Sequence, residues 1–316
     1  MDKLKINFVD FWPNFLKEDN YFYHLLSREF DVVIDEYDPD LLFFSVDYNK
    51  SRERDRFVNH RCKKIFYTGE SVPANFDIPT SIECSNHLAN YSIGQCDYAF
   101  TFDFSDDPRQ FRLPLWALQI DWFKKGGYGN PEYLLPLEDI DSNHYIKSPK
   151  TKFCAFIFNN PIPQRLEAYR QFEELYKKVD GYGTPFNNWF YGEREKYNIL
   201  KDYKFSICFE NRLYPGYYTE KLFHAKTSGT VPIYYADKNV GYDFNEKSFI
   251  NLNDFESMRD LIKHVQNVDC DDELYCKYTS EPLFKGSEIS PELFPEKVLS
   301  FFEDMVLKRV DDICGF

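Results

Sequence analysis

The stretch from Lys204 to Ala236, KFSICFENRLYPGYYTEKLFHAKTSGTVPIYYA, decides the expected fold of this chain. Its apolar start predicts a buried strand that ends at Glu210, and a Pro-Gly turn follows. A helix is expected from Tyr217 to Thr227, and a second apolar run at 231–235 predicts the next strand. In open parallel sheets ligands bind beyond the carboxyl ends of the strands, and helix N-termini favour phosphate. The stretch therefore predicts a crevice for an anionic nucleotide.

The composition of the chain excludes several classes of protein. At 316 residues, with 43% hydrophobic and 19% aromatic residues, the chain can form one large or two medium domains and is not disordered. Its formal net charge of −14 argues against nonspecific nucleic-acid binding, which needs a basic face. The eight cysteines form no CxxC pair and the six histidines lack metal-ligand spacing, so we expect reduced thiols and no metal.

The sequence predicts neither a signal peptide nor a transmembrane segment. The N-terminal residues MDKLKINFVDFW lack the apolar core of a secretory signal, and no apolar run approaches the ~20 residues that span a bilayer. Thiols scattered within apolar runs are typical of a reducing compartment. We therefore expect a cytoplasmic protein whose contact with a membrane is peripheral at most.

Strand and helix patterns alternate along the chain and predict an α/β fold. The expected strands lie at 5–10, 32–34, 41–45, 64–67 and 98–102, and again at 153–158, 205–209, 231–235 and 248–252. Strands alternating with helices at this spacing form mostly parallel sheets. The pattern stops in a segment rich in glycine and proline. We expect two Rossmann-like domains facing across a cleft: residues 1–149, with 119–149 as loop or linker, and residues 150–316.

The last predicted helix, 295–310, carries an apolar stripe and is assigned to the second domain. Its apolar residues recur with helical spacing, at Val298, Phe301, Phe302, Met305 and Val306. Such a stripe either covers a core or anchors a helix on a membrane. The other face is mixed in charge rather than basic, so the core-covering interpretation is preferred.

The predicted helix after the Pro-Gly turn carries the candidate binding groups. Tyr217, Glu220, Lys221 and His224 recur at i, i+3, i+4 and i+7 and would share one face. A lysine at this place can neutralise a diphosphate, and a carboxylate can accept hydrogen bonds from ribose hydroxyls. The alternative is an ordinary solvated, charged face.

Two further charged residues follow predicted strands. Arg165 closes the segment NNPIPQR at the start of a helix, where a guanidinium matches phosphate oxygens. Glu70 ends KIFYTGE, and Gly69 is expected to let the backbone turn and aim the carboxylate at the cleft. Facing an activated donor, Glu70 is a candidate general base. The alternative for Arg165 is a surface arginine, and a lone glutamate at a strand end is usually just a surface charge.

The block FENRLYPGYYTEKLFHAKTSGTVPIYY resembles the signature of the α-1,3-fucosyltransferases, glycosyltransferase family 10, in their bacterial form. Three other segments resemble bacterial members in the same order: IFYTGE (65–70), FDFSDDPRQFRLPL (102–115) and DFNEKSFINLNDF (243–255). The resemblance implies a GT-B fold, a GDP-fucose donor held mainly by the C-terminal half, and inverting transfer without a metal or other cofactor. It also implies a β-galactosyl-N-acetylglucosamine-type acceptor of the Lewis or lipopolysaccharide O-antigen kind, reached by peripheral contact at the inner membrane.

The same resemblance implies a role for each matching residue. Glu70 would be the general base, Arg165 and Lys221 would hold the diphosphate, and Glu220 would bind the ribose. Asn211 and Tyr217 would line the donor pocket.

The sequence departs from the family pattern at a few positions. Arg212 stands where a small residue is usual, Tyr218 replaces a valine, and Tyr235-Ala236 replaces Trp-Gly. Arg212 either adds a third cation near the donor or points to solvent. The same fold using another nucleotide sugar, and a non-catalytic glycan- or nucleotide-binding module, remain alternative functions.

Overall fold

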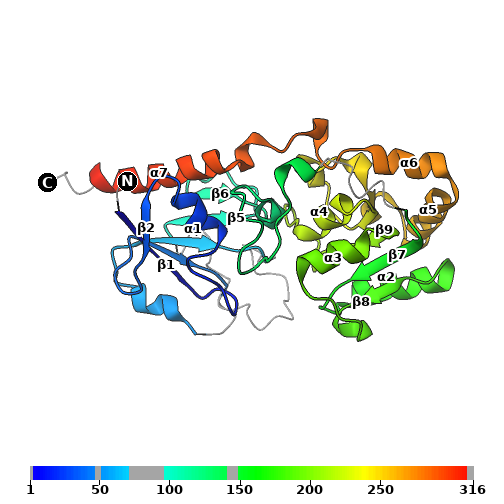
Figure 1. Cartoon of the computed structure of the whole chain (residues 1–316), viewed down its shortest axis with the longest axis horizontal. Helices are drawn as coiled ribbons and strands as arrows, with labels where there is room; N and C mark the ends of the chain where they lie inside the picture. The colour runs from blue at the N-terminus through cyan, green and yellow to red at the C-terminus, as the bar shows by residue number, and fades with distance from the viewer. Residues whose placement is uncertain (1–2, 47–50, 71–95, 141–148, 312–316) are drawn as a thin grey trace. The chain divides into compact units, whose positions relative to one another are not determined.

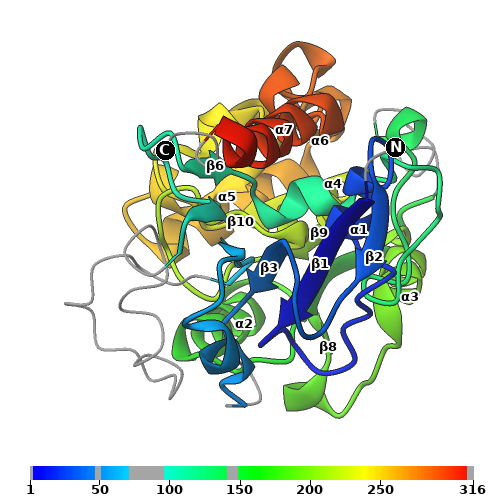
Figure 2. The same cartoon turned by 90° about the vertical axis from the view of Figure 1, so that its left-hand side faces the viewer.

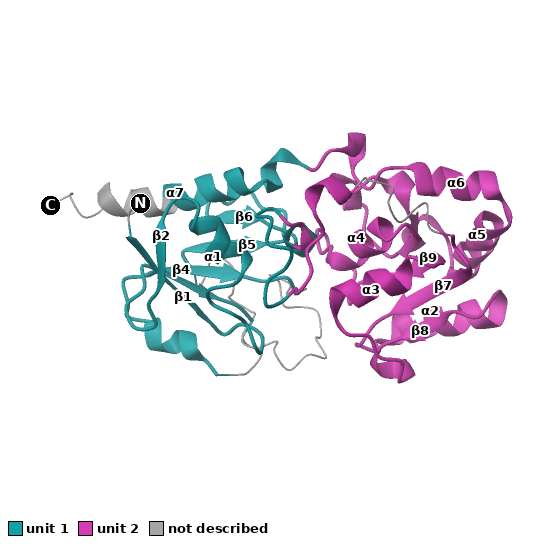
Figure 3. Ribbon diagram, in the orientation of Figure 1, with its two compact units in different colours: residues 1–118, 122–130, 290–316 teal, residues 119–121, 131–289 magenta. Residues whose placement is uncertain are grey.

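The computed structural model describes residues 3–46, 51–70, 96–140 and 149–311, with side chains described as far as residue 304. The chain divides into two compact units (Figure 3). The first comprises residues 1–118, 122–130 and 290–316, and the second comprises residues 119–121 and 131–289. Both are α/β units with a parallel sheet, which confirms the predicted fold class.

The first unit contains a six-stranded sheet in the order β2-β1-β3-β4-β5-β6, and all of its strand pairs are parallel. Its core contains many aromatic rings, and ring contacts join the strands to the helices. The elements are β1 (Lys3–Val9), α1 (Tyr21–Leu26), β2 (Asp31–Ile34), β3 (Leu41–Phe44), β4 (Lys63–Tyr67), β5 (Tyr98–Thr101), β6 (Gln110–Arg112) and α7 (Pro295–Asp311).

The second unit contains a five-stranded sheet in the order β11-β10-β9-β7-β8, also with parallel pairs. Its central strands are apolar on both faces, as expected for a sheet covered by helices. The elements are β7 (Lys152–Ile157), α2 (Pro163–Leu175), β8 (Asp180–Tyr182), α3 (Gly192–Leu200), β9 (Tyr203–Ile207), α4 (Glu220–Thr227), β10 (Val231–Tyr234), β11 (Ile250–Asn251), α5 (Met258–Cys270) and α6 (Asp272–Ser280).

The C-terminal helix α7 corrects the predicted division of the chain. The sequence predicts that it belongs to the second domain, but it packs with the first unit (Figures 1 and 2). Phe302 is fully buried and its ring stacks on Phe100 at 4.8 Å between centroids, with Phe43 5.8 Å away. The apolar stripe therefore covers a core, as preferred, but the core is that of the N-terminal sheet. The side chains of Met305 and Val306 lie outside the described residues.

The boundary between the units also differs from the predicted one at 149–150. Residues 131–140 belong to the second unit, as does the short segment 119–121. Leu135 joins the two segments by backbone hydrogen bonds. Its N–H donates to the Gln119 carbonyl oxygen (2.9 Å), and its carbonyl oxygen accepts from the Asp121 N–H (2.8 Å). The chain thus passes between the two units within the segment rich in glycine and proline, after residues 118, 121 and 130, and not at the predicted position 149–150. Among the helices that the structure describes, none is both long and apolar enough to cross a bilayer.

Candidate active site

A buried carboxylate organises the loop between β9 and α4. Glu210 follows β9 and is only 2% exposed. Its carboxylate accepts hydrogen bonds from the backbone N–H of Thr219 (2.8 Å), from the Thr219 hydroxyl, and from the hydroxyl of Tyr234 (2.8 Å). Because Thr219 immediately precedes α4, these bonds join the end of the strand to the start of the helix and close the intervening loop, 211–218.

Lys221, the second residue of α4, is the cation of this cluster. Its ammonium group donates a hydrogen bond to the Thr219 hydroxyl (2.8 Å) and lies 3.2 Å from Glu210 and 3.3 Å from Glu220. Burial would lower the pKa of Lys221, but the two carboxylates outweigh it and raise that pKa above its ordinary value. Lys221 is therefore a fixed positive charge at the N-terminus of a helix, where the helix dipole also favours an anion.

Glu220 is the first residue of α4 and lies between two lysines. Its Oε1 atom lies 3.3 Å from the Lys221 Nζ atom and 3.9 Å from the Nζ atom of Lys196 on α3. Burial alone would raise the pKa of Glu220, but Lys221 and Lys196 hold it below its ordinary value. The carboxylate is thus ionised at neutral pH and can accept hydrogen bonds from ligand hydroxyls.

Arg165 joins a second loop to the same edge of the sheet. It is the third residue of α2 and only 2% exposed. Its Nε and Nη2 atoms donate hydrogen bonds to the carbonyl oxygen of Phe209 (3.1 and 2.5 Å), and Nη1 donates to the carbonyl of Asn160 (3.3 Å). Phe209 directly precedes Glu210. The structure therefore places Arg165 beside the Glu210 cluster, at the carboxyl ends of the parallel strands β7 and β9.

Tyr217 and Asn211 lie in the loop, and the predicted helix start at Tyr217 is wrong. The helix begins at Glu220, because the backbone of Thr219 is extended (φ −98°, ψ −164°) and Gly216 has a φ of 84°, which favours glycine. Tyr217 therefore does not share a helical face with Glu220 and Lys221. It is buried, whereas Asn211 is half-buried. Of the family departures, Tyr218 is also buried and donates a hydrogen bond to Asp237.

His224 shares α4 with Glu220 but is not available to solvent. It is 1% exposed, and its Nδ1 atom lies 3.2 Å from the Lys196 ammonium group. The polar stripe that the spacing predicts is thus largely internal to the second unit. Sequence reasoning missed both Glu210 and Lys196 as members of the cluster. The first could be found from its place at the end of an apolar strand, but no local pattern marks the second.

Glu70 belongs to the first unit, whereas the other five predicted residues belong to the second. It is exposed, follows β4, and its backbone N–H donates to the Thr68 hydroxyl (2.9 Å). The backbone turn expected at Gly69 does not require a glycine. Gly69 does not have a positive φ, and a Cβ atom there would lie 2.9 Å from Cδ1 of Leu115, the flexible end of a side chain that can shift.

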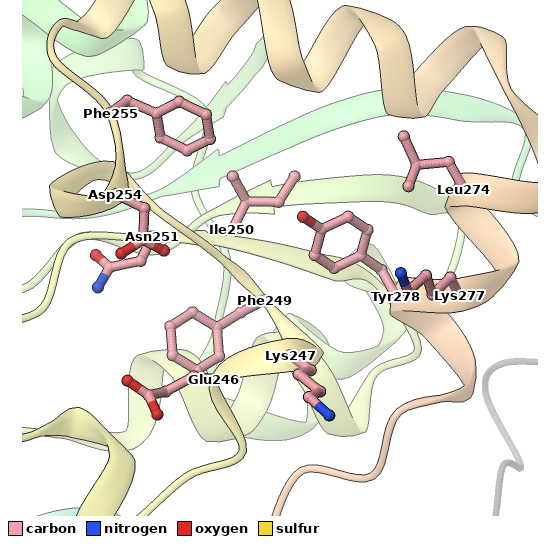
Figure 4. A pocket seen from close by; sticks show the side chains of 10 residues that line it. All are labelled: Glu246, Lys247, Phe249, Ile250, Asn251, Asp254, Phe255, Leu274, Lys277 and Tyr278. Atoms are coloured by element: carbon pink, nitrogen blue, oxygen red, sulfur yellow. The ribbon is translucent and has the colours of Figure 1, made fainter.

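A separate pocket of about 210 Å³ lies in the second unit (Figure 4). None of the six predicted site residues lines it. One wall comes from residues 246–255, which lie within the segment DFNEKSFINLNDF, and the other comes from α6. The lining residues are Glu246, Lys247, Phe249, Ile250, Asn251, Asp254, Phe255, Leu274, Lys277 and Tyr278.

Two family models match the chain, one for each half. The model of the α-(1,3)-fucosyltransferase N-terminal domain matches residues 6–119, and that of the glycosyltransferase family 10 (fucosyltransferase) C-terminal domain matches residues 147–280. The second match contains all of the Arg165, Glu210 and Lys221 cluster, and the first contains Glu70.

Curated relatives agree with the family models. An α-(1,3)-fucosyltransferase of Helicobacter pylori is 26% identical over 96% of this chain and 66% of its own length. A protein of Acanthamoeba polyphaga mimivirus named as a fucosyltransferase is 33% identical over 51% of the chain and 28% of its own length. Mouse 4-galactosyl-N-acetylglucosaminide 3-α-L-fucosyltransferase 9 is 29% identical over 41% of the chain and 36% of its own length. The chain thus spans less than two thirds of the length of these relatives.

Solved structures agree as well. A crystal structure of an α1,3-fucosyltransferase with GDP superposes with a TM-score of 0.67 at 25% identity, covering 96% of this chain and 89% of that one. The fold of two Rossmann-like α/β units is thus that of the GT-B glycosyltransferases. By its sequence blocks, its family models and its fold, the chain belongs to glycosyltransferase family 10, the family of the α-1,3-fucosyltransferases.

Proposed function

We propose that the protein is an inverting α-1,3-fucosyltransferase that moves L-fucose from GDP-fucose to a hydroxyl group of an N-acetylglucosamine-type sugar. The observation that best supports this proposal is the pair of cations, Arg165 and Lys221, at one edge of a parallel sheet. A diphosphate leaving group needs positive charge at such a place, and preorganised charge is commonly the largest contribution to catalysis. The family relative solved with GDP supports the same donor class.

In the proposed reaction, Glu70 removes the proton from the acceptor hydroxyl as its oxygen forms a bond to C1 of fucose. The attack comes from the face opposite GDP, and the bond between C1 and the β-phosphate oxygen breaks with its electron pair leaving on GDP. Arg165 and Lys221 stabilise the negative charge that develops on the diphosphate. Glu220 accepts hydrogen bonds from the ribose hydroxyls, and Asn211 and Tyr217 line the donor pocket.

No metal ion or other cofactor takes part in this proposal. The two side-chain cations supply the charge that a divalent ion would otherwise bring to a diphosphate. Transfer that continues undiminished in the presence of a chelator supports this part, and transfer that stops and is restored by a divalent cation contradicts it.

The proposed acceptor is a β-galactosyl-N-acetylglucosamine-type oligosaccharide of the Lewis kind. The support comes from the relatives, one of which is named for transfer to a 4-galactosyl-N-acetylglucosaminide. If the acceptor is the O-antigen part of a lipopolysaccharide, a cytoplasmic enzyme would meet it at the inner membrane by peripheral contact. Sedimentation with vesicles that contain the glycolipid, compared with vesicles that lack it, tests this contact.

A panel of nucleotide sugars tests the proposal against its alternatives. We expect turnover with GDP-fucose to exceed turnover with other GDP-sugars and with UDP-sugars. Higher turnover with another donor would show that the enzyme has the same fold but uses a different nucleotide sugar. Binding of GDP without transfer from any donor, to any of a set of type 1 and type 2 disaccharides, would instead indicate a non-catalytic binding module.

A further inference from the structure

Lys196 is a largely buried cation beside the predicted donor-binding residues. It lies on α3, and its side chain is 13% exposed. Its Nζ atom lies 3.2 Å from the Nδ1 atom of His224 and 3.9 Å from the Oε1 atom of Glu220, both on α4. The lysine therefore bridges two helices at the point where α4 carries the proposed ribose-binding carboxylate.

The contact with Lys196 fixes the form of His224. An ammonium group has only donors, so the Nδ1 atom of His224 must accept and its ring proton must be on Nε2. Burial, together with the charge of Lys196, lowers the pKa of His224 well below its ordinary value, so the imidazole is neutral. The three side chains thus form a buried set of one cation, one neutral acceptor and one anion.

Lys196 and Lys221 hold Glu220 in different ways. Lys221 is shared, because its ammonium group also lies 3.2 Å from Glu210. Among the residues that the structure describes, Lys196 has ion-pair geometry with Glu220 alone. Lys221 follows Glu220 in the sequence and moves with it, whereas Lys196 belongs to another helix. Lys196 is therefore the ion-pair partner that reaches Glu220 from another helix.

We propose that Lys196, held by His224, is a positioning residue that fixes the Glu220 carboxylate for hydrogen bonds to the ribose hydroxyls of the donor. This inference rests on the proposed function, since it needs a nucleotide with a ribose at Glu220. Without Lys196, the Glu220 carboxylate still pairs with Lys221 but can adopt other rotamers. A charge-assisted hydrogen bond contributes ~1.5–3 kcal/mol, so misplacing the carboxylate weakens ribose binding by about tenfold or more.

The experiment compares two nucleotides by titration calorimetry, GDP and 2′,3′-dideoxy-GDP, which lacks both ribose hydroxyls. Lys196→Met removes the charge and keeps the apolar stem. We expect this variant to bind GDP about tenfold more weakly than the wild type and to bind dideoxy-GDP as the wild type does. Lys204→Met is the matched control: Lys204 is another partly buried lysine of the second unit, paired with Asp269 at 2.7 Å. The Lys204→Met variant should bind both nucleotides with the affinity of the wild type.

A second variant guards against misfolding. Lys196→Gln retains a donor for His224 without the charge, and the same selective loss is expected. Equal weakening of both nucleotides in the folded variants, or unchanged affinity for GDP, would overturn the inference and leave the proposed function standing. A wild-type protein that does not bind GDP would overturn the proposed function, and the inference with it.

Discussion

The ammonium group of Lys221 lies 3.2 Å from the carboxylate of Glu210, a side chain that is 98% shielded from solvent. The same carboxylate holds the backbone N–H of Thr219, directly before α4. The cation proposed for the diphosphate is therefore fixed by the group that also closes the 211–218 loop. The position of the Lys221 cation and the closure of the 211–218 loop therefore both depend on the Glu210 carboxylate.

Replacement of Lys221 by alanine should weaken GDP binding. The lysine supplies a charge-assisted contact to the diphosphate, and such contacts are worth ~1.5–3 kcal/mol, so we expect the dissociation constant to rise by about ten- to a hundredfold. Titration calorimetry measures this directly. Lys263→Ala, an exposed lysine on α5, serves as the control. Unchanged affinity in Lys221→Ala would remove this residue from the donor site.

Glu70→Gln should separate binding from chemistry. Removal of a general base typically reduces the rate by ~10²–10⁴-fold, whereas the donor is proposed to bind to the other unit. We expect GDP affinity to be retained and kcat for fucose transfer to fall in that range. Glu29→Gln replaces another exposed carboxylate of the first unit and should transfer fucose normally. Turnover near the wild-type value in Glu70→Gln would refute the assignment of the base.

The Glu210 cluster should contribute strongly to stability. Glu210→Gln removes one of the two carboxylates that pair with Lys221 and leaves Glu220 as its partner. The ~3–5 kcal/mol cost of breaking a fully buried ion pair is therefore the upper bound for this variant. Tyr234→Phe removes a single hydrogen bond to the same carboxylate and should cost ~1 kcal/mol. Urea unfolding followed by circular dichroism gives both values. Equal, small losses in the two variants would show that Glu210 is not the organising group.

Much of the fold could be predicted because buried parallel strands leave continuous apolar runs. The run ending at Glu210 and the run at 231–235 both became central strands of one sheet. The assignment of α7 could not be predicted, because the stripe at Phe302 shows that a face is buried but not which core covers it. Only the ring contacts with Phe43 and Phe100 decide that.

Some residues of the candidate site could likewise be predicted from the sequence, and others could not. Glu220 and Lys221 could be found because they directly follow a strand–turn unit with recognisable sequence. Lys196 could not, because its contact with Glu220 joins two helices and leaves no local spacing. The start of α4 was misplaced because helical spacing from Tyr217 ignores Glu210, which holds Thr219 outside the helix. How Glu70 and the second unit meet stays a prediction.

The C-terminal helix should be required for the stability of the first unit. Phe302→Ala leaves a cavity among Phe22, Phe43 and Phe100, and a buried phenylalanine truncated to alanine costs ~3–5 kcal/mol. Hydrogen exchange should show faster exchange of the β1 and β5 amides. Asp304→Ala, exposed on the same helix, should change little. Faster exchange confined to the second unit would contradict the placement of α7.

Glu193 should make stability depend on pH. Burial, and then its hydrogen bond with Glu132, raise the pKa of Glu193 to about 7. The ordinary pKa in an unfolded chain is ~4.3, so between these values the folded state binds more protons and stability falls as pH rises. Glu193→Gln cannot ionise and should flatten this slope. Urea midpoints at a series of pH values test it, and parallel profiles for the two proteins would contradict the raised pKa.

The most direct test of the central claim is the structure of the product. The wild-type protein is incubated with GDP-fucose and a type 2 disaccharide, with a type 1 disaccharide in parallel, and the products are analysed by NMR. Fucose is β-linked in GDP-fucose, so inverting transfer predicts an α-linked fucose on O3 of the N-acetylglucosamine residue in the type 2 product. A β-linked product, or no fucosylated product at all, would contradict the account.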